Sequence, residues 1–128
     1  MDQPEGFIKP GDEDKVCLLK QSLYGLKQAP LCWNKKLNEH FTKTMSFQRL
    51  STDICLYRRD GVYVVVYVDD MLVYGKSQEI CDNIYNELTT EFSCTNLGFP
   101  KGMLGMIISP VEGGVIIHQQ KYIDELLD

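Results

Sequence analysis

Two adjacent carboxylates, Asp69 and Asp70, are the side chains of this sequence best suited to chemistry. They interrupt a run of β-branched, aromatic and other apolar residues at positions 62–75, so the pattern predicts a hairpin with both acids at its tip. Like charges in contact repel and resist joint burial, so folding alone does not favour this pair. A divalent cation such as Mg²⁺, which prefers hard oxygen ligands, would neutralise it. The alternative is a solvated Asp-Asp turn, which is the commoner case for a bare pair.

The elements beside this hairpin define where the acids lie. We expect a strand at residues 54–57, followed by a turn at Asp60-Gly61, a dipeptide typical of tight hairpins. The simplest topology is then three consecutive antiparallel strands, with Asp69 and Asp70 at the second turn.

Two amphipathic helices flank these strands. The first begins at Pro30, which is tolerated in the first turn of a helix, and its apolar residues recur every four positions: Ala29, Trp33, Leu37, Phe41 and Met45. The second follows Ser77, a predicted N-cap, with Glu79 in the first turn. Its apolar face contains Ile80, Ile84, Leu88 and Phe92.

The remaining segments give shorter patterns. Residues 1–14 predict an extended acidic loop, residues 16–19 a short strand and residues 47–52 a polar connection. Strands are expected at residues 103–108 and 115–118, with a turn at residues 112–114 between them. A final helix is expected at residues 119–128, with an apolar face of Tyr122, Ile123, Leu126 and Leu127.

Length and composition narrow the class of protein. A chain of 128 residues with 44% hydrophobic and 24% charged residues predicts one soluble globular domain. Its longest apolar run is far shorter than a membrane helix, so no membrane association is expected. Five widely spaced cysteines and two histidines argue against a zinc site or a disulfide framework and favour a reducing compartment. The net charge of −5 is unusual for a nucleic-acid enzyme, although the basic residues gather between positions 15 and 59.

Two motifs in order carry a resemblance to a known family. Residues 22–30 read SLYGLKQAP and are followed by Trp33, and residues 67–70 read YVDD. Together with residues 1–7, Leu104-Gly105 and residues 119–127, they make nearly the whole chain resemble the reverse transcriptase of copia-type LTR retrotransposons. The length of the first motif leaves little room for a plain α+β domain with a solvated turn.

The resemblance implies an α+β fold: a polymerase palm, with helices on one face of an antiparallel sheet, and part of the fingers. It divides residues 1–128 into an arm at 1–15, a palm and fingers fragment at 16–118 and the start of a helix towards the thumb at 119–128. Asp69 and Asp70 would be catalytic and would ligate Mg²⁺ or Mn²⁺. Nucleotide and template would contact Gly25, Lys27, Gln28, Tyr67 and Val68, and Leu104 with Gly105 would belong to the primer grip.

The implied function is RNA-directed DNA polymerisation, in which two metal ions assist transfer of a nucleotide from dNTP to a primer 3′-hydroxyl. The family's first catalytic aspartate lies in a motif upstream of Met1, so we expect a fragment that binds metal weakly and is inactive alone. The alternative is a non-catalytic palm-like module, or a retrotransposon remnant, that binds protein or nucleic acid. The parent enzyme would act on template-primer in cytoplasmic virus-like particles or in the nucleus, and uncovered sheet edges would favour self-association.

Overall fold

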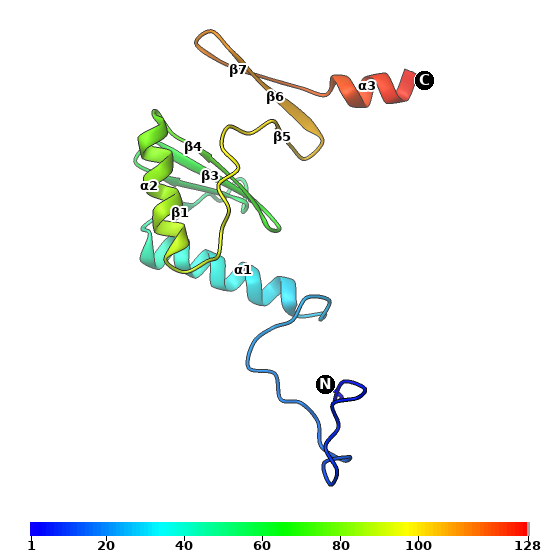
Figure 1. Cartoon of the computed structure of the whole chain (residues 1–128). Helices are drawn as coiled ribbons and strands as arrows, with labels where there is room; N and C mark the ends of the chain where they lie inside the picture. The colour runs from blue at the N-terminus through cyan, green and yellow to red at the C-terminus, as the bar shows by residue number, and fades with distance from the viewer. Residues whose placement is uncertain (128) are drawn as a thin grey trace. The chain divides into compact units, whose positions relative to one another are not determined.

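The computed structural model describes residues 1–127 as an α+β chain that divides into two compact units, Met1–Arg49 and Leu50–Asp128. The first unit contains α1, a π-helical turn η1 and a short strand β1: Ala29–Glu39, His40–Thr44 and Gln48–Arg49. The second contains β2 (Leu56–Arg59), β3 (Val62–Tyr67), β4 (Asp70–Tyr74), α2 (Gln78–Thr89), β5 (Gly102–Met103), β6 (Met106–Val111), β7 (Gly114–His118) and α3 (Gln120–Leu127). Figure 1 shows these elements in chain order.

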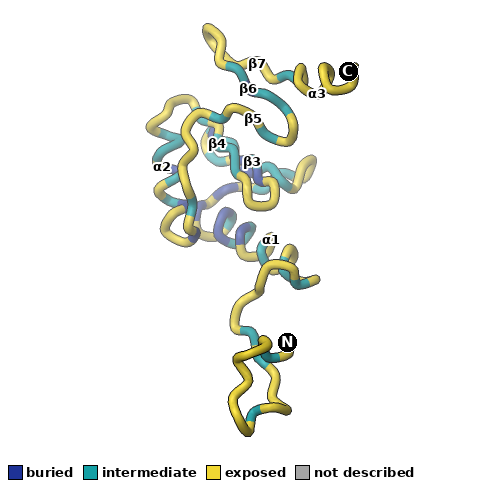
Figure 2. The backbone as a smooth tube through the Cα atoms, turned by 45° about the vertical axis from the view of Figure 1, so that its right-hand side comes forward, coloured by how far each residue is buried: buried dark blue, intermediate teal, exposed yellow. Residues whose placement is uncertain are grey.

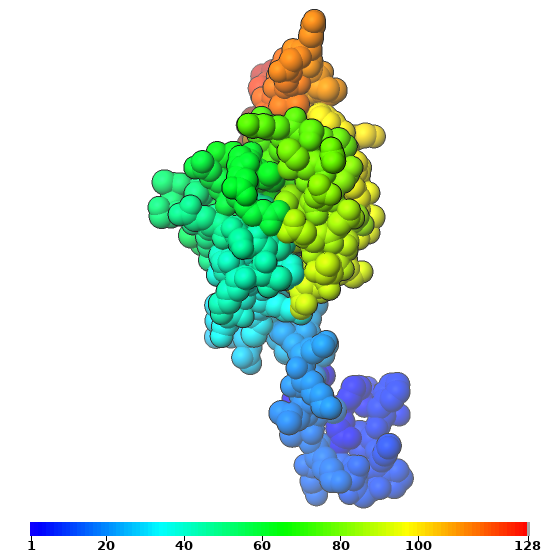
Figure 3. All heavy atoms as spheres, turned by 90° about the vertical axis from the view of Figure 1, so that its left-hand side faces the viewer, coloured from blue at the N-terminus to red at the C-terminus, as the bar shows by residue number. Residues whose placement is uncertain are grey.

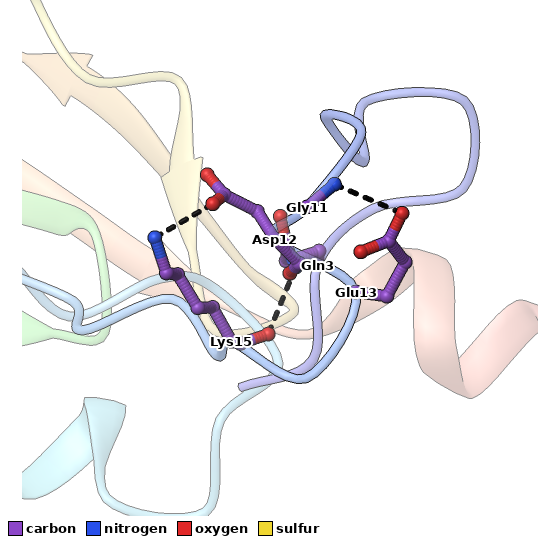
Figure 4. Close-up of polar contacts among 5 residues, drawn as sticks. All are labelled: Gln3, Gly11, Asp12, Glu13 and Lys15. Carbon is purple, nitrogen blue, oxygen red and sulfur yellow. Dashed lines mark hydrogen bonds and ion pairs between the residues drawn. The ribbon is translucent and has the colours of Figure 1, made fainter.

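The arm before α1 is held by its own polar contacts. The Gln3 side-chain amide donates to the carbonyls of Asp12 and Lys15, at 2.6 and 2.9 Å, and Lys15 Nζ lies 2.6 Å from Asp12 Oδ1 (Figure 4). The backbone N–H of Gly11 donates to Glu13, which lowers the pKa of that carboxyl. The expected strand at residues 16–19 is wrong: this segment is irregular, although the Cys17 N–H donates to the Met1 carbonyl and the Cys17 carbonyl accepts from the Met1 amino group.

The first predicted helix is confirmed, but its last turn widens. In η1 the N–H of Met45 donates to the carbonyl of His40, five residues back. The Thr42 hydroxyl donates to the Asn38 carbonyl at 2.7 Å, and so competes for an acceptor of the regular helical pattern. Phe41 is fully buried and meets Phe47 edge to face, with ring centroids 5.4 Å apart. The residues after the helix are therefore not only a polar connection.

In the second unit, β2, β3 and β4 form consecutive antiparallel hairpins, as the sequence predicted. The strand expected at residues 54–57 starts later, at Leu56, because the Asp53 carboxylate accepts the Cys55 N–H and turns the chain there. Asp60 and Gly61 both have positive φ, the backbone of the tight turn that their types predict.

One face of this sheet is buried and supports α2. Val62, Val64 and Val66 alternate as buried residues along β3, and α2 begins at its predicted cap, Ser77, which accepts the Ile80 N–H. Ile84 and Leu88 of α2 are also buried. The atoms of these elements pack closely in the space-filling view (Figure 3, green). A bidentate ion pair from Arg59 on β2 to Glu87 on α2, both bonds 2.7 Å, joins strand and helix.

A second antiparallel sheet has the order β5-β6-β7 and is much less buried (Figure 2). The single strand expected at residues 103–108 is wrong, because Leu104 and Gly105 adopt positive φ and form a turn between β5 and β6. The hairpin of β6 and β7 and the helix α3 agree with prediction, but the expected apolar face of α3 is exposed, and Asp128 lies outside the described residues. No helix in the described part of the chain is long and apolar enough to cross a membrane.

Candidate active-site hairpin

The two acids lie at the tip of the β3–β4 hairpin, although the turn is shifted by one residue from expectation. The two-residue loop is Val68-Asp69, and Asp70 is already the first residue of β4, paired with Tyr67. Asp69 therefore belongs to the turn and Asp70 to the sheet, so their side chains start from different backbone geometries.

The turn is not built from residues that favour it. Val68 has φ 54°, and Asp69 keeps a negative φ, the pattern of a turn that normally places glycine first. A β-branched residue in the left-handed region is unfavourable by about 1–3 kcal/mol, and such strain gathers at functional sites. The sequence indicated an unfavourable turn at this place, since neither Asn-Gly nor Asp-Gly occurs there.

Both carboxylates are open to solvent. Asp69 and Asp70 are exposed, and among the described residues neither accepts a hydrogen bond or forms an ion pair. Tyr67 and Val68 beside them are 51% and 62% exposed. The turn therefore presents two unneutralised negative charges, together with an aromatic ring, at one end of the sheet.

The donor set suits a hard divalent cation that is shared with a substrate. Within residues 1–127 no cluster of three or more acidic, histidine or cysteine side chains could hold a metal. Mg²⁺ is commonly held by only one or two protein carboxylates, with water and substrate phosphates as its other ligands. Asp69 and Asp70 fit that role, whereas a closed structural metal site would need more ligands than they supply.

The register also fixes which face of the sheet Asp70 occupies. Residues two apart on a strand share a face, so Asp70 lies on the face of Leu72 and Tyr74, opposite the buried valines. This face, which we call the open face, carries no fully buried residue. Asp70 is thus on the side of the sheet away from α2.

The other predicted site residues lie elsewhere in the chain. Gly25, with φ 89°, forms a β-turn in which the Leu26 N–H donates to the Leu23 carbonyl, and Lys27 and Gln28 are exposed just before α1. These three residues belong to the first unit, and Asp69 and Asp70 to the second.

The predicted primer-grip residues, Leu104 and Gly105, occupy the β5–β6 turn of the second sheet. They line an open pocket of about 370 Å³ together with Gln119, Lys121, Tyr122 and Glu125. The structure thus brings Tyr67, Val68, Asp69 and Asp70 together on the β3–β4 hairpin. Leu104 and Gly105 lie on the β5–β6 hairpin.

A serine–histidine pair offers a different chemistry that its geometry does not support. Ser109 Oγ and His118 Nε2 are 3.4 Å apart on neighbouring strands. His118 Nδ1 accepts the backbone N–H of Gln120, so Nε2 carries the proton and donates to the serine. This tautomer cannot take a proton from the hydroxyl, so the pair is structural.

One group of residues was missed by reasoning from the sequence. Arg58, Tyr63 and Tyr74 lie directly opposite one another across β2, β3 and β4 on the open face. Their types are ordinary in strands, and only the cross-strand register brings them together. The Asp60-Gly61 turn could have predicted the Arg58–Tyr63 pair, but the Tyr63–Tyr74 pair depends on the Val68-Asp69 turn, whose position was not predicted.

Comparison with known proteins gives one consistent family. The family model described as reverse transcriptase (RNA-dependent DNA polymerase) matches residues 1–128. The chain is 35% identical to the retrovirus-related Pol polyprotein from transposon TNT 1-94 of Nicotiana tabacum, over 100% of this chain and 10% of the relative. It is 34% identical to the corresponding polyprotein from transposon RE1 of Arabidopsis thaliana, over 99% of this chain and 9% of the relative.

A shorter relative, a putative transposon Ty5-1 protein of Saccharomyces cerevisiae, is 40% identical over 94% of this chain and 41% of its own length. No solved structure matches the chain significantly. The chain therefore spans about a tenth of the Pol polyproteins and less than half of the yeast protein. The match along the full sequence shows that this chain belongs to the reverse transcriptase family, as a domain of the kind found in copia-type retrotransposon Pol polyproteins.

Proposed function

We propose that this chain is the part of an RNA-directed DNA polymerase that holds catalytic metal ions. The observation that carries the proposal is the β3–β4 tip, where a strained turn holds two exposed carboxylates without any protein partner among the described residues. Template-directed transfer of a nucleotide from dNTP to a primer 3′-hydroxyl is the reaction that this site would serve.

In this function Asp69 and Asp70 hold Mg²⁺ or Mn²⁺. When bound, the metal supplies activation of the primer hydroxyl and neutralisation of phosphate charge. The chain's own contribution is positional: the strands fix Asp70 on the open face, and the turn holds Asp69 beside it. Tyr67 and Val68 lie next to these acids and would support the primer end.

The remaining roles follow the family. Gly25, Lys27 and Gln28 would contact nucleotide and template, because a glycine turn lets backbone approach a ligand closely and an exposed lysine can face phosphate. Leu104 and Gly105 would contact the primer strand. Template, primer and dNTP are therefore the proposed partners of the complete enzyme.

Metal binding tests this proposal directly. We expect Mn²⁺ or Mg²⁺ at millimolar concentration to raise the melting temperature of the 128-residue chain, because the cation relieves repulsion between Asp69 and Asp70. Asp69→Asn should abolish the rise. Asp60→Asn is the matched control, because it changes an acid of the other hairpin turn and should leave the rise intact. An equal response of all three proteins, or none in any, would contradict the proposal.

Primer extension on an RNA template tests completeness. We expect no extension by the 128-residue chain alone, since the described residues provide only two carboxylates at this site. Extension that disappears in Asp69→Asn would show instead that the site is complete within these residues. If neither the unmodified chain nor Asp69→Asn extends the primer, but metal binding depends on Asp69, the chain holds metal and requires further ligands for catalysis.

A further inference from the structure

The row of Arg58, Tyr63 and Tyr74, which we call the arginine–tyrosine row, lies on the same face of the sheet as Asp70. The pairs Arg58–Tyr63 and Tyr63–Tyr74 are direct cross-strand neighbours. The two rings have centroids 6.5 Å apart and planes tilted by 47°, and the Arg58 guanidinium lies 5.9 Å from the Tyr63 ring centre. The three side chains thus form one continuous surface across the strands.

This surface is accessible and carries charge that the protein does not neutralise. Tyr74 is 66% exposed and Arg58 is exposed. Among the described residues no carboxylate forms an ion pair with Arg58, in contrast to Arg59, which Glu87 holds. A guanidinium stacked on a ring keeps its N–H donors free for an anion.

These features together match one class of ligand. Single-stranded nucleic acid is bound by aromatic rings on which bases stack and by cations that meet the phosphates. An exposed ring next to an exposed arginine supplies both on a single row. A partner without negative charge would leave the Arg58 cation unpaired.

The distance from the arginine–tyrosine row to Asp70 allows one continuous strand of nucleic acid to reach both. Tyr74 and Asp70 are four residues apart on β4, so they are separated by about 13 Å along the strand. A stacked nucleic-acid strand rises about 3.4 Å per nucleotide, so about four nucleotides would cover this distance.

We propose that the arginine–tyrosine row is a second contact for nucleic acid, which binds a single-stranded segment of template or primer about four nucleotides from Asp69 and Asp70. Tyr74 stacks on a base and Arg58 binds a phosphate. The inference rests on the proposed function for its choice of ligand, but it makes a claim about binding that does not require metal or catalysis.

Binding of a short fluorescein-labelled single-stranded RNA to the 128-residue chain, followed by fluorescence anisotropy in EDTA, tests the row apart from the metal site. Tyr74→Leu should weaken binding about five-fold or more, because it removes a stacking ring. Arg58→Gln should lower the slope of log K against log salt concentration by about 0.7, since one phosphate contact is lost. Melting curves should show that both variants stay folded, as both side chains are exposed.

Phe99→Leu and Lys101→Gln, in the segment between α2 and β5, are matched controls, because they remove an exposed ring and an exposed cation outside the row. Both should bind RNA like the unmodified chain. No RNA binding by the unmodified chain, unchanged binding by the row variants, or equal losses in the controls would each overturn the inference. If metal binding at Asp69 fails while the row variants lose RNA affinity, the proposed function fails and the row stands. If metal binding depends on Asp69 but the row variants bind RNA like the unmodified chain, the inference about the row fails and the proposed function stands.

Discussion

The two faces of the β2–β4 sheet are made by neighbouring residues but differ in what holds them. Arg58 and Arg59 are adjacent in the chain, yet Glu87 holds Arg59 on the face of α2, whereas Arg58 lies over Tyr63 on the open face. Val64 and Val65 differ in the same way, since only Val64 is fully buried. The buried face stabilises the fold, and the open face leaves Arg58, Asp70 and Tyr74 exposed to solvent.

The largest effect that tests this comparison is expected in the centre of β3. Val64→Ala should lower the free energy of unfolding by about 2 kcal/mol, because it removes buried methyl groups and leaves a cavity. Val65→Ala, the matched change on the open face, should cost less than about 1 kcal/mol. Urea unfolding followed by circular dichroism measures both. Equal losses would show that the two faces are buried alike.

The two turns beside β3 should respond in opposite directions. Gly61→Val should lower the free energy of unfolding by about 2 kcal/mol, because Gly61 has φ 81° and a β-branched residue is strained there. Val68→Gly should instead raise the free energy of unfolding by about 0.5–1 kcal/mol, since it removes similar strain from the Val68-Asp69 turn.

Thermal melting of both variants tests whether the strain at Val68 is real. A loss of stability in Val68→Gly would show that the turn is not strained. If Val68→Gly is more stable but the Mn²⁺-dependent rise in melting temperature becomes smaller, the strain serves to hold Asp69 in position.

The smallest expected effect separates the adjacent arginines. Arg59→Gln should lower the free energy of unfolding by about 1 kcal/mol, a small value because Glu87 is 40% exposed and water screens the ion pair. Arg58→Gln should change the free energy of unfolding by less than about 0.5 kcal/mol. The side-chain hydrogen bonds to Glu87 raise the pKa of Arg59. A raised arginine pKa adds stability at every pH below the range in which an unfolded arginine loses its proton, so the cost of Arg59→Gln should be the same from about pH 7 to about pH 9. Equal costs for Arg58→Gln and Arg59→Gln would contradict the assignment of their faces.

Local patterns in the sequence were enough to predict much of the second unit. Asp60-Gly61 predicted a tight turn, Ser77 a helix start and the acids a hairpin tip, because each depends on backbone preferences of one or two residues. The break at Leu104 and the late start of β2 were not predicted, since apolar residues continue through both places.

The open face shows why part of the site could not be predicted. The run from Val62 to Tyr67 is apolar at every position, so its pattern does not say which residues face α2. Register across β2 and β4 decides this, and register depends on contacts between separate segments. The same dependence hid the arginine–tyrosine row, whereas Asp69 and Asp70 were visible as neighbours in the chain.

The exposed β6–β7 hairpin has a consequence for handling the protein. Val115, Ile116 and Ile117 of β7 are 46%, 52% and 57% exposed, and β7 is at the edge of its sheet. An apolar, uncharged edge strand invites pairing with other chains and attracts chaperones that bind unfolded segments. Ile116→Lys, which places a charge on this edge strand, should therefore reduce aggregation during recombinant expression.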